Sequence, residues 1–170
     1  MISQGGAEPS FPPRVVVCVG AVVLKEAKAL FVRQSYGGMK GVWSIPWGFF
    51  EGRGPQGATV DPEATALREV KEEAAIEAEI VGFLGIQQDV RESGESTVYL
   101  IFLCQHTTGE PRPDGYETDR ATFFSLAEMD ELGEPVDEFC RWIVKRVLSH
   151  RHTVLEPCAD NPYSPHLAFL

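Results

Sequence analysis

The chain has 170 residues and is 44% hydrophobic, which is enough to build the core of one compact domain. Its 25 acidic and 15 basic residues give a formal net charge of −10, and this negative charge disfavours nucleic acid or an anionic membrane as the main partner. The four cysteines are far apart and form no C-x-x-C motif, so the sequence predicts reduced thiols, no zinc site and a cytoplasmic location.

The first part of the chain reads as a leader followed by two strands. Residues 1–13 lack the basic-then-apolar pattern of a signal peptide, and we expect a flexible or surface-laid leader. Residues 15–24 are a β-branched apolar run, too short to span a membrane, which predicts a central strand buried on both faces. Residues 29–34 predict a second strand. Near its end, Arg33 is a candidate for phosphate contact, with a surface ion pair as an equal alternative.

A glycine-rich loop then leads into an aromatic segment, WSIPWGFFEGRG, at residues 43–54. This segment reads as a short strand entering a loop punctuated by glycine and proline. Lys40 and Trp43 are candidates for substrate contact, because a flat indole stacks on a nucleobase. A core position is the favoured alternative for Trp43. Trp47 and Gly48 are also assigned to the substrate-binding site, with Trp47 crowding or lining its mouth.

Residues 62–76 predict a helix with a core side and an acidic side. Asp61 is suited to cap its start, and Pro62 favours the first helical turn. Helical spacing places three apolar side chains on the core side, with a fourth at its margin. These are Leu67, Val70 and Ala74, with Ala66 at the margin.

The acidic side carries Glu69, Glu72 and Glu73, which share a narrow arc because residues three and four apart are neighbours on a helix. Facing like charges cost roughly 0.2–0.5 kcal/mol per pair unless something neutralises them. Mg²⁺ takes carboxylate oxygens as ligands and keeps positions open for water and phosphate. The alternative is an ordinary solvated face, on which Arg68 and Lys71 offset part of the repulsion.

Beyond this helix the sequence predicts three strands and two further helices. The strands are expected at residues 77–88, 97–106 and 121–125, and the helices at residues 126–132 and 135–150. Gly82 and Gly85 are bulge positions in the first of these strands. Strands flanked by helices imply one domain over residues 14–150 with a mixed sheet between helical layers. The tail, residues 151–170, packs on this domain or on a partner subunit, as in a homodimer.

Around the acidic helix the sequence resembles the Nudix hydrolase family, whose signature is G-x₅-E-x₇-R-E-U-x-E-E-x-G-U, with U an aliphatic residue. Gly48 looks like the opening glycine, and residues 68–76, REVKEEAAI, match the second half. The specific part is R-E-x-x-E-E, set after a Pro-x-Gly loop and a capped helix start. The resemblance implies an α/β fold, a Nudix-type α/β/α sandwich with a mixed β-sheet between helices.

The sequence departs from this signature in three places. Gly48 lies 20 positions before Arg68, six more than in the signature, which predicts an insertion at residues 53–60. Val60 stands at the place of the loop glutamate. Two nearby acids are alternatives for its role: Glu51 and Asp61. Ala75 replaces the glycine that ends the helix, and alanine in a left-handed turn costs about 1 kcal/mol or forces another ending.

The resemblance implies hydrolysis of the pyrophosphate bond of a nucleoside diphosphate linked to another moiety, such as a nucleotide sugar or a nucleoside triphosphate. Mg²⁺, with Mn²⁺ as an alternative, would neutralise the phosphates and lower the pKa of a bound water. The implied metal ligands are Glu69, Glu72, Glu73 and Glu117.

The resemblance also implies catalytic roles. Glu69, Glu72 or Glu117 would position or deprotonate water, while Arg68 orients a glutamate through an ion pair. Asp119 is the alternative to Glu117, and a merely exposed loop acid is a third interpretation. A different class of function also stays open, namely a non-catalytic nucleotide-binding or regulatory domain. The sequence does not identify the small-molecule nucleotide substrate.

Overall fold

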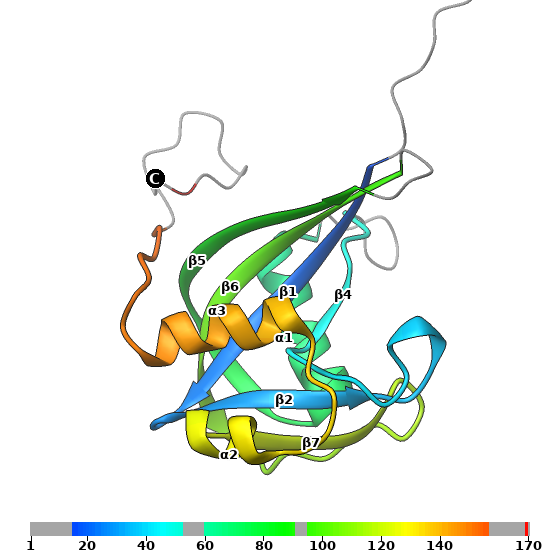
Figure 1. The fold of residues 1–170 in the computed structure, drawn as a ribbon. Coiled ribbons are helices and arrows are strands. Elements are labelled where there is room, and N and C mark those ends of the chain that lie inside the picture. Colours follow the sequence, from blue (N-terminus) through cyan, green and yellow to red (C-terminus); the bar gives the residue numbers. More distant parts are fainter. Residues whose placement is uncertain (1–14, 53–59, 91–94, 157–168, 170) are drawn as a thin grey trace, which may run out of the picture.

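The computed structural model describes residues 15–52, 60–90, 95–156 and 169, which form a seven-stranded mixed sheet with helices on both faces (Figure 1). The predicted leader, and all but the last residue of the predicted insertion, lie outside the described residues. The α/β/α architecture expected from the sequence is confirmed. Within the described ranges, no helix is long and apolar enough to cross a membrane.

The sheet is built around its central strand, β1 (Val15–Lys25), in the order β3-β2-β1-β6-β5. β1 runs parallel to β6 (Ser96–Thr108) and antiparallel to β2 (Lys28–Gln34). The other strands pair antiparallel: β5 (Glu77–Val90) with β6, β4 (Trp47–Phe49) with β1, and both β3 (Trp43–Ser44) and β7 (Thr118–Phe124) with β2. Register shifts next to Gly82 and Gly85 confirm the two predicted bulges.

One edge of β1 serves two partners. It pairs with β4 at residues 18–20 and with β2 at residues 24–25. The two partner strands therefore leave β1 in different directions (Figure 1). The 3₁₀ helix η1 (Gly37–Met39) and β3 connect β2 to β4. The candidate site lies between the diverging ends of β2 and β4 and the loop that connects them.

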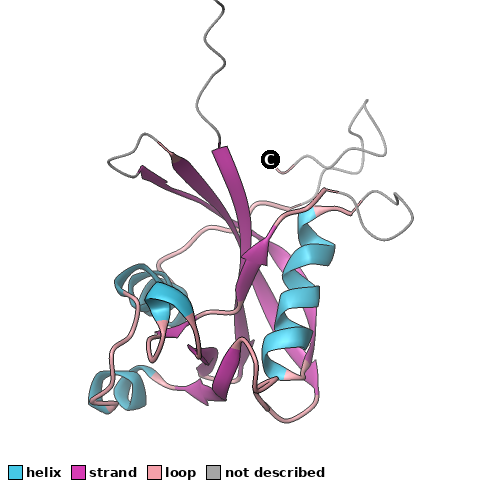
Figure 2. Ribbon diagram, turned by 90° about the vertical axis from the view of Figure 1, so that its right-hand side faces the viewer, coloured by secondary structure: helices cyan, strands magenta, loops and turns pink. Residues whose placement is uncertain are grey.

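Helix α1 (Pro62–Ala74) covers one face of the sheet, and α2 (Leu126–Glu131) and α3 (Glu138–Leu148) cover the other (Figure 2). Successive side chains of a strand point to opposite faces, so the buried strands supply two cores. In β6, Leu103 belongs to the core beneath α3, whereas Phe102 belongs to the core beneath α1. This two-sided burial accounts for the continuous apolar runs at residues 18–23 and 101–104.

The ends of α1 follow the capping rules. The Asp61 carboxylate accepts a hydrogen bond from the Ala64 backbone N–H at 2.7 Å, which confirms the predicted cap. At the other end Ala75 has a φ of 55°, in the left-handed region, and its N–H donates to the Lys71 carbonyl oxygen at 3.0 Å. The helix therefore stops in the usual left-handed turn although the residue there is alanine.

The inward face of α1 and the start of α3 differ from the prediction. Ala66 is fully buried, and it is Leu67 that lies at the margin of the core, so the inward face of α1 is rotated from the predicted one. Helix α3 begins at Glu138 and not at residue 135, because Val136 forms a β-bridge with Trp43. Asp137 then caps the helix by accepting from the Cys140 N–H at 2.8 Å.

Described parts of the tail pack on this domain. Leu155 and Phe83 exchange two backbone hydrogen bonds of 2.9 Å, which adds a short bridge to the free edge of β5. Gly82 permits this approach, because a Cβ there would lie 2.8 Å from the Leu155 carbonyl oxygen. The Phe169 ring lies 5.4 Å from the Phe83 ring and 5.6 Å from the Phe102 ring.

Candidate functional site

A cavity of about 200 Å³ lies between α1, β4 and the loops that follow β2 and precede β7. We call it the acidic cavity, because carboxylates are its commonest lining groups. Its lining residues are Gln34, Tyr36, Trp47, Gly48, Phe49, Glu51, Arg68, Glu69, Glu72, Glu73 and Glu117. The four predicted metal ligands therefore lie around one space, although Glu117 is 44 residues from its nearest acidic partner in the sequence.

Glu73 is the most deeply buried of these acids, with 2% of its surface exposed. Its carboxylate accepts hydrogen bonds from the Gln34 side-chain amide at 3.3 Å and from the Trp47 backbone N–H at 3.1 Å. Burial raises the pKa of Glu73 to about 8, and these two hydrogen bonds oppose the rise. Glu73 is thus a fixed group that gains strongly from a positive partner.

Glu69 is also buried, with 4% of its surface exposed. Burial raises its pKa to about 7, the Arg68 guanidinium opposes the rise, and the charges of Glu72 and Glu117 add to it. The backbone of Gly48 passes directly over the carboxylate, and a Cβ at that position would overlap all three carboxylate atoms. Glycine is therefore required where the signature has one, because β4 packs against this side chain.

Arg68 and Glu72 form the outer rim. Arg68 lies 2.5 Å from Glu69 and 2.6 Å from Glu72, so one guanidinium bridges two of the acids. The ion pair expected for Arg68 is confirmed. The Glu72 side chain keeps 53% of its surface exposed, which leaves it accessible to solvent and ligands.

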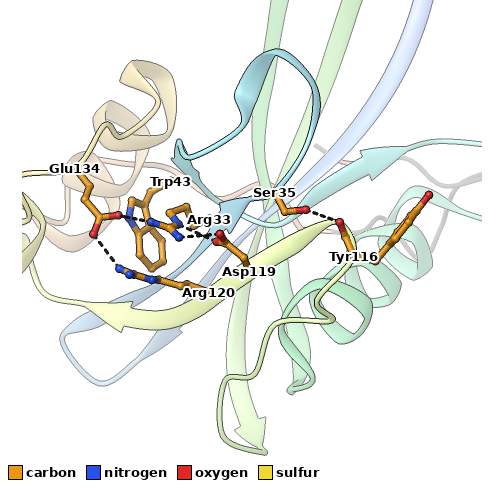
Figure 3. A network of polar contacts seen from close by, with 7 residues as sticks. All are labelled: Arg33, Ser35, Trp43, Tyr116, Asp119, Arg120 and Glu134. Carbon is orange, nitrogen blue, oxygen red and sulfur yellow. Dashed lines mark hydrogen bonds and ion pairs between the residues drawn. The ribbon is translucent and has the colours of Figure 1, made fainter.

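The loop that carries Glu117 is held in place by its neighbours. The Asp114 carboxylate accepts backbone N–H groups from Tyr116, Glu117 and Thr118, and these bonds lower the pKa of Asp114 against the opposing effect of burial. The Thr118 hydroxyl donates to the Glu73 carbonyl oxygen at 2.8 Å, which ties the loop to α1. The Ser35 hydroxyl donates to the Tyr116 carbonyl oxygen (Figure 3). Glu117 therefore approaches the acidic cavity on an anchored loop.

The lining groups match the preference of a hard divalent cation. Among the described residues, the lining provides several carboxylates and neither a thiol nor an imidazole, and oxygen ligands are those that Mg²⁺ and Mn²⁺ favour. Two of the acids have raised pKa values, so a cation would relieve a real electrostatic cost. In the described part of the chain, no three acidic, histidine or cysteine side chains converge as ligands of one ion. Shared coordination requires a change of partners, above all for Glu72, which faces Arg68.

Other residues predicted for the site lie elsewhere. Arg33 forms a two-point ion pair with Asp119, at 2.8 and 2.7 Å, and contacts Glu134 at 3.0 Å (Figure 3). The surface ion pair, given as the equal alternative for Arg33, is therefore present, and it also occupies Asp119. Lys40 is exposed and outside the acidic cavity.

Trp43 lies in the core, which was the favoured alternative for it, with 2% of its surface exposed. Its indole N–H donates to Glu134 at 3.0 Å (Figure 3). Between the two alternatives for the missing loop glutamate, Glu51 lines the acidic cavity, whereas Asp61 is the cap of α1.

Sequence reasoning missed Gln34 and Tyr36. Gln34 is 4% exposed and donates to both Glu73 and the Ser44 hydroxyl, the latter at 3.2 Å. The sequence signal that could have identified Gln34 was its position at the end of an apolar strand, where its amide lies on the same face as Val32. Tyr36 is 55% exposed and lines the acidic cavity, and its pKa is raised by burial and by the charge of Glu117.

Known proteins match the part of the chain that forms the sheet and the acidic cavity. The family model described as the NUDIX domain matches residues 14–143. An ADP-ribose pyrophosphatase from Methanocaldococcus jannaschii is 26% identical over 131 residues, which cover 74% of this chain and 73% of that protein. The NAD-capped RNA hydrolase NudC from Vibrio parahaemolyticus is 28% identical over 137 residues, which cover 81% of this chain and 48% of that protein.

Solved structures show the same fold. The crystal structure of a MutT NUDIX hydrolase from Burkholderia pseudomallei superimposes with a TM-score of 0.65 at 23% identity, covering 79% of this chain and 98% of that one. The family model spans well over half of the chain and includes both the R-E-x-x-E-E segment and the acidic cavity built on it. The chain therefore belongs to the Nudix hydrolase family.

Proposed function

We propose that the protein is a Mg²⁺-dependent pyrophosphohydrolase acting on a nucleoside diphosphate linked to another moiety, with ADP-ribose-like compounds as the first class to test. The observation that carries this proposal is the acidic cavity, in which two buried glutamates and three more accessible ones surround one small space. The names of the two curated relatives support the substrate class, since ADP-ribose and the NAD cap both contain a diphosphate attached to adenosine.

The net charge of the cavity requires a cation for such a substrate. Arg68 is the single basic group among its described lining residues, and its one positive charge is already shared between two acids. A bound divalent ion would supply the remaining positive charge, hold the phosphates and lower the pKa of the attacking water. Glu69, Glu72, Glu73 and Glu117 are the residues that would hold it.

The side chains differ in how they are suited to the reaction. Glu73 is fixed by two hydrogen bonds, so it serves as a holder and not as a mobile proton acceptor. Glu69, Glu72 or Glu117 accepts the proton of the water whose oxygen attacks one phosphorus atom. The bond between that phosphorus and the bridging oxygen breaks, and the second phosphate leaves with the bridging oxygen. The products are a nucleoside monophosphate and the phosphorylated second moiety.

A substrate panel with purified protein tests this proposal. We expect release of AMP from ADP-ribose or a related compound in the presence of Mg²⁺ or Mn²⁺, and none in EDTA. Glu72→Gln should lower the rate by about 10²–10⁴-fold, the range seen when groups that act in proton transfer are removed. Glu73→Gln should also lower the rate, because one of the groups that would hold the cation loses its charge. Glu79→Gln, an exposed acid on β5, is the matched control and should leave the rate unchanged. Tight binding of the same compounds without turnover would instead support a non-catalytic binding domain.

Two further expectations accompany this function. Cys18, Cys104 and Cys140 are free and buried, which supports reduced thiols and the predicted cytoplasmic location. A homodimer also remains a prediction, for which sedimentation analysis is the direct measurement.

A further inference from the structure

We propose that a cavity between α3 and β5 binds a flat aromatic monocarboxylate, at a site separate from the acidic cavity. The cavity has a volume of about 410 Å³, within the roughly 300–1,000 Å³ typical of small-molecule sites. We call it the α3 cavity. It shares no described lining residue with the acidic cavity, and α3 and α1 cover opposite faces of the sheet (Figure 2). The inference therefore does not depend on the proposed hydrolysis.

Two large apolar side chains that line the α3 cavity are more than half exposed. The exposed fraction is 52% for Trp142, on α3, and 67% for Ile86, on β5. Single exposed apolar residues are common, but two that line one cavity form an apolar patch of the kind that marks a binding site. Phe139 also lines the cavity and lies beside Trp142, with ring centroids 5.9 Å apart and planes inclined by 33°. These surfaces favour a flat ring by burial and stacking.

The charge of the α3 cavity is opposite to that of the protein as a whole. The chain has a formal net charge of −10, yet the described lining of this cavity contains no acid and two basic side chains, Arg146 and His152. The Arg146 guanidinium lies over the Trp142 ring, 5.2 Å from its centroid, and has no ion pair within the described part of the chain. A guanidinium held in this way is free to donate two hydrogen bonds to one carboxylate. Its single charge matches a monoanion.

A second polar group of the α3 cavity also favours a ligand. The Nδ1 atom of His152 is buried and has no hydrogen-bond partner among the described residues. A buried polar atom without a partner is costly, and a ligand that forms a hydrogen bond with it removes this cost. His152 follows α3 and lines the cavity together with Thr153, whose hydroxyl is a further hydrogen-bonding group. The cavity thus combines apolar walls with polar groups suited to one carboxylate.

NMR titration with three indole compounds of similar size tests the inference. Indole-3-acetate is an anion, indole-3-acetamide is neutral and tryptamine is a cation. The chain has three tryptophans, whose indole N–H signals report on three places: Trp43 in the core, Trp47 at the acidic cavity and Trp142 in the α3 cavity. Trp142→Phe identifies its signal. We expect indole-3-acetate to shift the Trp142 signal and to bind about tenfold more tightly than indole-3-acetamide, as expected for a hydrogen bond between charged groups. Tryptamine should bind most weakly.

Variants of Arg146 test the role of its charge. In Arg146→Gln, indole-3-acetate should bind no more tightly than indole-3-acetamide, whereas Arg146→Lys keeps a positive charge and should keep part of the preference. Arg141→Gln is the matched control, because Arg141 lies on the same helix but pairs with Asp130 at 2.9 Å, and this variant should keep the full preference.

Three results would overturn the proposal. The first is equal binding of the three compounds to the native protein. The second is a preference for indole-3-acetate that survives in Arg146→Gln, and the third is an absence of shifts in the Trp142 signal. Because the titration needs neither metal nor turnover, its outcome is independent of the hydrolase assignment.

Discussion

The contact between Gly48 and Glu69 leads to a prediction that can be worked out from the structure. In Gly48→Ala, the new Cβ would occupy the place of the Glu69 carboxylate. Either β4 moves away from α1 or Glu69 leaves its buried position. Inserting a methyl group into a packed interior costs about 1–3 kcal/mol. We therefore expect Gly48→Ala to lower the free energy of unfolding by an amount in this range, and to lower the hydrolytic rate because Glu69 is displaced.

A double-mutant cycle isolates the contact. Glu69→Ala removes the atoms that the new Cβ would meet, so Gly48→Ala should cost much less in that background. Urea unfolding of the four proteins measures the coupling free energy, which we expect to be about 1–3 kcal/mol. Costs that add to within about 0.5 kcal/mol would show that the two residues are independent, and the geometry of the acidic cavity described above would then be wrong. Gly38→Ala, where a Cβ meets nothing within 4 Å, is the control for stability.

Three further predictions concern pH and the ends of α1. The pKa values of Glu69 and Glu73 are raised in the folded protein to about 7 and about 8, so the metal-free protein should lose stability as pH rises from about 5 to about 8. In thermal unfolding with EDTA, Glu73→Gln should make this dependence of stability on pH less steep. A native protein whose stability does not change with pH would contradict the burial of these acids. Asp61→Ala should cost about 1 kcal/mol in urea unfolding, whereas Asp61→Asn should be nearly neutral, because both native and asparagine side chains accept the Ala64 N–H. Ala75→Gly should raise the free energy of unfolding by about 1 kcal/mol, because glycine adopts the left-handed conformation without strain, and no gain would mean that the turn relaxes in solution.

The sequence carried most of the information about α1, because its signals are local. Asp61 and Pro62 lie next to the helix they start, and the acids at i, i+3 and i+4 define one arc of its surface. These features, together with the family signature, were sufficient to predict the fold and the acidic cluster. The burial of Glu69 and Glu73 was not predictable in this way, since it depends on where β4 packs.

The contacts of Arg33 and Trp43 are made with residues far away in the sequence. Both contact Glu134, which lies 101 and 91 positions away in the chain. A single sequence gives no measure of which acid folds back onto which base, so contact with phosphate and a surface ion pair were indistinguishable for Arg33. The late start of α3 has the same origin, because the backbone at residues 135–137 is engaged by Trp43.

The bridge between Phe83 and Leu155 has a consequence for how the protein behaves in solution. β5 is a strand of 14 residues at the border of the sheet, with Val81, Ile86 and Val90 exposed along it. An unpaired edge strand of this length can pair with strands of other molecules. The two backbone hydrogen bonds to Leu155 occupy the middle of this edge. Truncation variants that end before residue 153 should therefore aggregate on heating at lower temperatures than the full chain. The segment that contains Leu155 would then protect the edge of β5 from pairing with other copies of the chain, and so from aggregation.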